Sequence, residues 1–256
     1  MFELECCQKY LGLTVDVAPQ TVSWRDINNC GAKYVVWKLH TESTTPAVLD
    51  RCVDAAEHMP NVKHINDPRH WMTCHAKERA FAIWQAVGVP CPKWFEFEDE
   101  RQFFAKCNVA YPLLLRLNNS TCGGYSWLVH DEGEARRCLP QLMASKHAHH
   151  DGINSDGVER KFIAVQFINT CRREGVNMSL RIIAAGQRVI TGYARLGPAS
   201  DWVAITNRFD SSMEAAFVKY QKFCQTFCQA YESEIVQSMR SLGLNFQGVD
   251  VIFDQS

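Results

Sequence analysis

The sequence predicts an α+β protein, and three observations support this prediction. The chain has 256 residues, enough to bury one large core or two to three smaller ones. Apolar residues make up 46% of it and charged residues 21%, as in ordinary globular proteins. Short stretches typical of strands alternate with longer stretches of helical spacing along the whole sequence, and no segment is repeated.

Composition and charge exclude several classes of protein. The formal net charge is −1, so no overall positive field attracts nucleic acid or an anionic membrane surface. No apolar run approaches membrane-spanning length, and the N-terminus lacks the basic and apolar regions of a secretory signal. The 12 cysteines are scattered through apparent helices and strands, which favours reduced thiols. We therefore expect a cytoplasmic protein.

The first part of the chain, 1–65, is expected to form a small α/β lobe. Residues 47–59 carry apolar side chains at helical spacing. Strand-like stretches precede and follow this helix; they are 13–18, 34–39 and, more weakly, 62–65. Met1 leads directly into helix-like sequence with no strand before it, an arrangement consistent with an incomplete lobe.

The remaining residues continue the alternation. Glycines at the ends of periodic stretches, such as Gly88 and Gly243, favour helix termination there. Gly186 and Gln187 separate two strand-like runs and predict a hairpin turn. Helices are expected at 71–87, 98–107, 131–149 and 212–242. Strands are expected near Trp94, on both sides of a glycine loop within 111–129, and at 161–169, 178–184, 188–195 and 247–254.

The segment 111–129 is the most informative. An apolar run ends at one cation, Arg116, and a polar loop with the adjacent glycines Gly123 and Gly124 follows. Glycine allows backbone N–H groups to turn toward an anion, and arginine offers a two-pronged donor for phosphate oxygens. Taken alone, the segment is also consistent with an ordinary hairpin that has a basic residue at its end.

Two clusters carry metal-ligating residue types. Cys224 and Cys228 share one face of a predicted helix, and a second cluster contains His147, His149, His150 and Asp151. Neither is paired with a second cluster at zinc-finger spacing. Small core residues in the first case and a solvated loop in the second are the simpler interpretations.

From Ile65 onward the order of motifs resembles the ATP-grasp superfamily, the carboxylate–amine ligases that include D-alanine–D-alanine ligase, glutathione synthetase and ribosomal-protein glutamyl ligases. The motifs are the segment 64–94, the glycine hairpin 111–129, the run 164–170, the run 179–210 and the segment 242–254. The resemblance implies an ATP-grasp fold, in which a small N-terminal α/β lobe precedes two α+β lobes that enclose a nucleotide cleft. The expected divisions are 1–65 for the first lobe and 66–256 for the ATP-grasp domain, divided into 66–110, 111–169 and 170–256.

The same resemblance implies a set of site residues. Lys77, Arg116, Gly123 and Gly124 would contact nucleotide phosphates, although the family usually has lysine where this chain has Arg116. The adenine edge and walls would be provided by Val165, Gln166, Phe167 and Ile168, with Gln166 at a position where an acidic residue is common. The catalytic positions would be Arg181, Arg195 and Asn207. Because Arg181 lies in an apolar strand, its charge needs a partner, which could be phosphate or a structural carboxylate.

The resemblance also implies ATP and Mg2+ or Mn2+ as cofactors, with Asp250 as a metal ligand. The glutamate and asparagine that the family carries on its next strand do not follow Asp250, and the sequence ends at Ser256. Magnesium prefers a near-octahedral shell of oxygen ligands, and one aspartate is a reduced set. We therefore expect either a fragment of a longer protein, truncated at its C-terminus, or a reduced and inactive member of the family.

If the full-length protein is longer than this chain, the expected activity is that of an ATP-dependent ligase. A substrate carboxylate, on a small molecule or a peptide, would attack the γ-phosphate of ATP, and an amine acceptor would displace phosphate from the resulting acyl phosphate. The alternatives are a nucleotide- or partner-binding module without catalysis on the same fold, and an unrelated α/β protein whose glycine loop is only a turn.

Overall fold

The computed structural model describes residues 33–37, 39, 44–120, 123–147, 160–200, 202 and 211–254. The strand expected at 13–18 lies outside these residues. No described helix is both long and apolar enough to span a membrane.

The first described lobe is small. Strands β1 (Tyr34–Val36) and β2 (Lys63–Ile65) pair in parallel, and helix α3 (Pro46–Glu57) connects them. The helix begins at Thr45, whose hydroxyl accepts a hydrogen bond from the Val48 N–H, and proline follows at the first helical position, where its missing N–H costs nothing. Alternation of strand, helix and strand predicted this unit.

The second lobe contains a four-stranded antiparallel sheet in the order β3-β6-β4-β5. The strands are β3 (Trp94–Phe97), β4 (Leu113–Leu117), β5 (Ser126–Val129) and β6 (Phe162–Gln166). Helices α6 (Glu100–Lys106) and α7 (Glu132–Ala144) pack on this sheet and share its core of phenylalanine and leucine side chains. The predicted hairpin at 111–129 is confirmed as β4 and β5.

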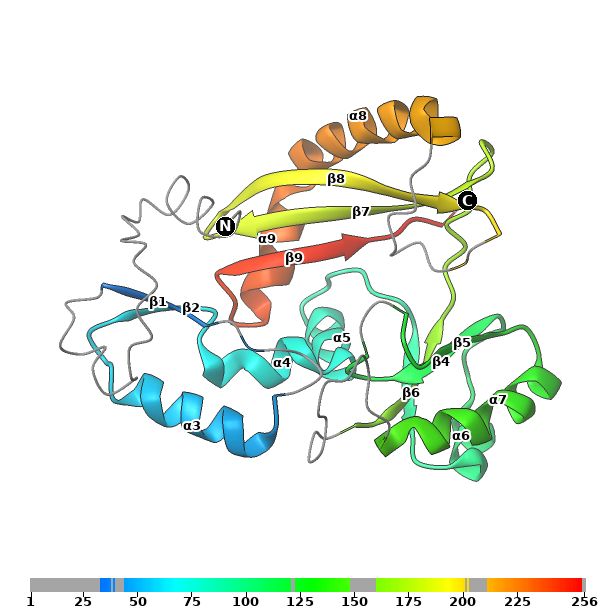
Figure 1. Cartoon of the computed structure of the whole chain (residues 1–256), viewed down its shortest axis with the longest axis horizontal. Coiled ribbons are helices and arrows are strands. Elements are labelled where there is room, and N and C mark those ends of the chain that lie inside the picture. The colour runs from blue at the N-terminus through cyan, green and yellow to red at the C-terminus, as the bar shows by residue number, and fades with distance from the viewer. Residues whose placement is uncertain are drawn as a thin grey trace.

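The third lobe contains a three-stranded antiparallel sheet in the order β8-β7-β9. Its strands are β7 (Val176–Ala185), β8 (Arg188–Pro198) and β9 (Phe246–Val251), and helices α8 (Glu214–Ala230) and α9 (Glu232–Ser241) cover one face (Figure 1). Alternate residues such as Leu180, Ile182 and Ala194 point into the core below these helices. The residues between them therefore belong to the opposite face of the sheet.

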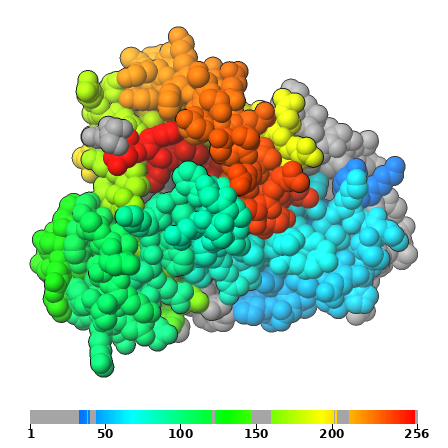
Figure 2. Space-filling view, turned by 180° about the vertical axis from the view of Figure 1, so that it is seen from behind, coloured from blue at the N-terminus to red at the C-terminus, as the bar shows by residue number. Residues whose placement is uncertain are grey.

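Helices α4 (Trp71–His75) and α5 (Lys77–Ala86) lie between the lobes, preceded by a 3-10 turn η1 (Pro68–His70). Two further 3-10 turns are η2 (Ser145–His147) and η3 (Ser211–Met213). Helix α5 contacts both α9 and β3. The indole N–H of Trp84 donates to the Ser238 carbonyl oxygen at 2.8 Å, and Figure 2 shows α9 in orange-red against the cyan and teal segments. Helix α5 thus joins the second and third lobes.

Two predicted helices were wrong in one respect, because each is interrupted. The helix expected at 71–87 breaks at Ala76, which has extended backbone angles, and the helix expected at 212–242 breaks at Tyr231. Neither break is marked by glycine or proline. At the first break the Lys77 N–H donates to the Asn118 carbonyl oxygen, and just after the second the Glu232 carboxylate accepts from Arg188 and from the Val189 N–H. At Lys77 a tertiary hydrogen bond thus replaces a helical one, whereas at the second break the Glu232 side chain links the start of α9 to β8.

Candidate functional site

Lys77 and Arg116 meet at the start of the glycine loop. The Lys77 Nζ donates to the carbonyl oxygens of Ser120 at 2.7 Å and Asn118 at 3.1 Å. The Arg116 Nη2 donates to the Ser120 carbonyl oxygen and to its hydroxyl oxygen, both at 3.0 Å. Lys77 begins α5 and Arg116 lies near the end of β4, so two separate elements bring their cations to one carbonyl group.

Asn118 fixes this arrangement through both its backbone and its side chain. Its carbonyl oxygen accepts from Lys77, its N–H and Oδ1 pair with the backbone of Lys161, and its Nδ2 donates to the Glu78 Oε1 at 3.1 Å. Both Asn118 and Glu78 are buried. Because these bonds connect the first turn of α5 with the adjacent strands β4 and β6, they hold the two cations in register.

The environment of Arg116 favours an anion. The Arg116 side chain donates only to neutral oxygens, those of Leu117 and Ser120, and within the described residues no carboxylate pairs with it. Burial lowers the pKa of the Arg116 guanidinium to about 10. A desolvated cation with neutral partners is stabilised when a negative charge arrives, which is the property expected of a phosphate site.

The end of β6 partly fits the expected adenine edge. The Gln166 N–H donates to the Lys93 carbonyl oxygen at 2.8 Å, and the Phe167 N–H donates to the Pro112 carbonyl oxygen at 3.2 Å. Val165 is buried within the sheet, opposite Trp94. Ile168, just beyond the strand, is half-buried and makes no backbone hydrogen bond to other described residues. Ile168 therefore has both its N–H and its C=O group left for a ligand within the described residues, whereas Gln166 and Phe167 already use their N–H groups.

Three further candidates meet on the sheet of the third lobe. The Asp250 Oδ1 lies 2.9 Å from the Arg181 Nη1 and 3.3 Å from the Arg195 Nη1. The three residues come from three adjacent strands and occupy the face opposite α8 and α9, as the alternation of Asp250 with Val249 and Val251 predicts. Arg181 thus has a carboxylate partner, which is one of the two alternatives expected for a cation in an apolar strand.

The structure therefore describes two groups, one around Ser120 and one around Asp250, and a single cleft that contains both stays a prediction. Gly123 has a φ of 74°, which glycine adopts without strain, while Asn207 lies outside the described residues.

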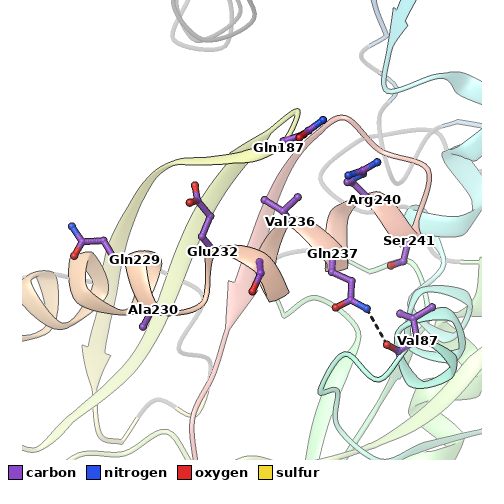
Figure 3. Close-up of a pocket in the computed structure, with 10 residues that line it drawn as sticks. Val87, Gln187, Gln229, Ala230, Glu232, Val236, Gln237, Arg240 and Ser241 are labelled. Carbon is purple, nitrogen blue, oxygen red and sulfur yellow. Dashed lines mark hydrogen bonds between the residues drawn. The ribbon is translucent and has the colours of Figure 1, made fainter.

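The two described cavities lie elsewhere. One, of about 800 Å³, is bordered by α9, the β7–β8 turn and the end of α5, where the Gln237 Nε2 donates to the Val87 carbonyl oxygen at 3.1 Å (Figure 3). The other, of about 240 Å³, lies between α3 and α4.

The described side chains do not fit a protein-bound magnesium ion. Among the described residues, no group of three or more His, Cys, Asp and Glu side chains is arranged to hold a metal. Asp250 stands beside two arginines, and these cations would repel Mg2+. The histidine cluster after His147 lies outside the described residues. Cys224 and Cys228 pack against Gly192 in the core, and burial raises the pKa of the Cys224 thiol to about 12, so the pair is structural.

Sequence reasoning missed three residues that shape these groups. Glu78 and Asn118 position the cations, and Gly248 leaves room for the Arg181 guanidinium, which would lie 2.6 Å from an added Cβ. The pair of asparagines directly after β4 was the available signal for Asn118. A buried glutamate next to Lys77 and a glycine within a strand carry no distinctive local pattern.

Comparison of the sequence with family models and with curated proteins gives no match. Comparison of the structure with solved structures finds several similar proteins. D-alanine–D-alanine ligase from Bacillus anthracis matches with a TM-score of 0.54 at 11% identity, covering 92% of this chain and 70% of that one. L-amino acid ligase from Bacillus licheniformis matches with a TM-score of 0.51 at 16% identity, covering 79% of this chain and 44% of that one.

A third match is N5-carboxyaminoimidazole ribonucleotide synthetase from Thermotoga maritima, with a TM-score of 0.51 at 9% identity, covering 90% of this chain and 50% of that one. The chain has the ATP-grasp fold. The α+β architecture expected from the order of motifs is thereby confirmed, and an unrelated α/β fold is excluded. The chain spans less than two thirds of the length of two of these three proteins.

Proposed function

We propose that this protein binds ATP and acts as an ATP-dependent ligase that joins a carboxylate to an amine through an acyl phosphate. The observation that carries the proposal is the convergence of Lys77 and Arg116 on the Ser120 carbonyl group, in a chain with the ATP-grasp fold. The similar structures are ligases or synthetases by name, which supports the reaction class. Fold similarity alone leaves the substrates open.

The phosphate groups of ATP would bind at the first group of residues. Lys77 and Arg116 would exchange the neutral Ser120 carbonyl oxygen for phosphate oxygens, with a gain in electrostatic stabilisation because phosphate is charged. The N–H groups of Gly123 and Gly124 would reach the same oxygens. The adenine edge would meet the backbone at Ile168, between the apolar side chains at the end of β6.

The proposed chemistry has two balanced steps. An oxygen of the substrate carboxylate attacks the γ-phosphorus of ATP, forming one P–O bond as the bond to the bridging oxygen breaks, and ADP leaves. The amine nitrogen then attacks the acyl carbon, forming a C–N bond while the C–O bond to phosphate breaks and the nitrogen loses a proton. Lys77 and Arg116 would offset the charge of the reacting phosphate, and Arg181 and Arg195 would hold the anionic reactants together. Asn207 stays a proposed catalytic residue on resemblance alone.

Hydroxylamine trapping tests this reaction. The protein is incubated with ATP, magnesium, hydroxylamine and a panel of amino acids and short peptides as carboxylate donors, and ADP and hydroxamate are measured. Equal formation of ADP and hydroxamate with one donor, lost in Arg116→Ala but kept in the exposed Arg137→Ala, is the expected result. ADP release that no carboxylate stimulates and that yields no hydroxamate would contradict ligase chemistry.

A second candidate function is nucleotide binding without catalysis. The observation that favours it is the pairing of Asp250 with two arginines, which leaves the expected metal ligand neutralised. ATP binding that depends on Lys77 and Arg116, combined with no hydroxamate from any donor, would support this candidate over the ligase.

A further inference from the structure

The ion cluster of Arg181, Arg195 and Asp250 has a definite geometry. Arg181 on β7 is directly opposite Asp250 on β9, and Arg195 on β8 is opposite Ser179, one alternation away on the same face. Both guanidinium groups reach the same carboxylate oxygen, Oδ1. Their side chains are 30% and 15% exposed, so the cations are partly removed from water.

Gly248 allows the Arg181 side chain to lie flat on the sheet. An added Cβ at this position would lie 2.6 Å from the Nε and Nη2 of Arg181 and 2.8 Å from its Cζ. Any larger residue at position 248 would therefore displace the guanidinium. The glycine and the aspartate, two residues apart on one strand, together fix where the Arg181 cation lies.

The Arg195 side chain also contacts two groups of the sheet. Its guanidinium lies 5.7 Å from the centre of the Tyr193 ring, close enough for a favourable cation–π interaction. Its Nη1 also lies 3.3 Å from the Asp250 Oδ1. Both arginines are thus oriented by groups of the sheet itself, before any ligand binds.

The charge balance of the cluster favours an anion over a cation. Among the described residues of the cluster, two guanidinium groups and one carboxylate leave a net charge of +1. A divalent cation at Asp250 would lie within a few ångströms of both arginines, and like charges at that distance repel by several kcal/mol even near a protein surface. A phosphate or carboxylate group would instead be attracted by two preoriented donors.

We infer that Asp250 is the counter-ion that orients Arg181 and Arg195 toward a phosphate or carboxylate group, and that it is not the ligand of a protein-bound metal. The inference deepens the proposed function. It rests on that function only for the identity of the natural anion, which would be a nucleotide phosphate or a substrate carboxylate. It concerns a group of residues separate from Lys77 and Arg116, so each site can fail on its own.

The test measures the binding of three ligands without any turnover. Manganese alone is titrated by electron paramagnetic resonance, and inorganic phosphate and acetate are titrated by calorimetry to separate the two anion classes. The variants are Arg181→Ala, Arg195→Ala, Asp250→Asn and Gly248→Ala. Exposed Arg188→Ala is the control, because Arg188 lies on the same sheet but pairs with Glu232. Circular dichroism establishes that each variant is folded, and Arg181→Lys replaces Arg181→Ala if the latter is not.

We expect wild type to bind phosphate or acetate, with affinity about 10- to 100-fold lower in Arg181→Ala and Arg195→Ala, as for a lost charge-assisted hydrogen bond. Gly248→Ala and Asp250→Asn should both weaken the same anion, because each removes a group that fixes the guanidinium groups, whereas Arg188→Ala should not. Manganese should bind wild type no better than Asp250→Asn. Manganese binding that Asp250→Asn abolishes would overturn the inference, and so would a wild type that binds neither anion, because the cluster would then be a purely structural ion pair.

Discussion

Asn66 and Asn245 hydrogen-bond to each other although 179 residues separate them in the sequence. The Asn66 N–H donates to the Asn245 Oδ1 at 2.8 Å, and the Asn66 Oδ1 accepts from the N–H groups of Asn245 and Phe246. The Asn245 Nδ2 also donates to the His64 carbonyl oxygen. The end of β2 is thus tied to the start of β9, which fixes the small first lobe against the sheet that carries Asp250.

Replacing Asn66 tests this connection. Asn66 has a φ of 53°, a left-handed conformation that asparagine tolerates better than alanine does. Asn66→Ala should lower the free energy of unfolding by about 1–3 kcal/mol, because two N–H groups lose their acceptor and the backbone is strained. Asn66→Gly should cost less, since it removes only the acceptor. Urea denaturation measures both, with exposed Asn61→Ala as the control; equal stability of all three variants would contradict this role.

Packing at Gly192 gives a second prediction. A Cβ added there would lie 2.7 Å from the Cys228 Sγ and 2.8 Å from the Cys224 Sγ, so α8 rests directly on β8 at this point. Gly192→Ala should destabilise the fold by about 1–3 kcal/mol through overpacking. Adding Cys228→Ala should restore part of that loss by removing one sulfur atom. Thermal unfolding checks both changes, and a double variant less stable than the sum of the single changes would argue against a steric cause.

The loop before β7 gives a pH-dependent prediction. Hydrogen bonds from Lys219 and Tyr220 lower the pKa of the Glu174 carboxyl from its ordinary value of 4.5 to about 2. Because the folded-state pKa is depressed, this contribution to stability is present above about pH 4.5 and is lost as the pH falls toward 2. Glu174→Gln should therefore lower stability at neutral pH, and the difference from wild type should shrink over that range. A difference in the free energy of unfolding, measured by urea denaturation, that does not change with pH would contradict this prediction.

Local sequence patterns were sufficient to predict most elements. Amphipathic spacing shows which side chains are buried, and glycines mark where helices end and hairpins turn. The hairpin around Arg116 and the strand with Asp250 between two core valines are examples. The breaks at Ala76 and Tyr231 could not be predicted in this way. At the first break the Lys77 N–H donates to the distant Asn118 carbonyl oxygen in place of a helical acceptor, and just after the second the Glu232 side chain binds the distant Arg188; such partners leave no local signal.

The candidate site was predictable to a similar extent. Arg181 in an apolar strand required an ionic partner, and a structural carboxylate was one of the two possibilities. Its identity as Asp250, shared with Arg195, depends on the register of three strands. Likewise the glycine loop suggested an anion site near Arg116, but the meeting with Lys77 depends on how α5 packs against β4.

The most direct measurement of the central claim is calorimetric titration of ATP and GTP into wild type, Lys77→Ala, Arg116→Ala and the exposed-residue controls Arg137→Ala and Lys222→Ala. The account predicts that wild type binds ATP in preference to GTP. It also predicts that Lys77→Ala and Arg116→Ala each weaken ATP by about 1–3 kcal/mol, the range for a charge-assisted phosphate contact, while the controls do not. Absence of heat with ATP at about millimolar concentration, where binding would still contribute about 4 kcal/mol, or unchanged affinity in both variants, would contradict it.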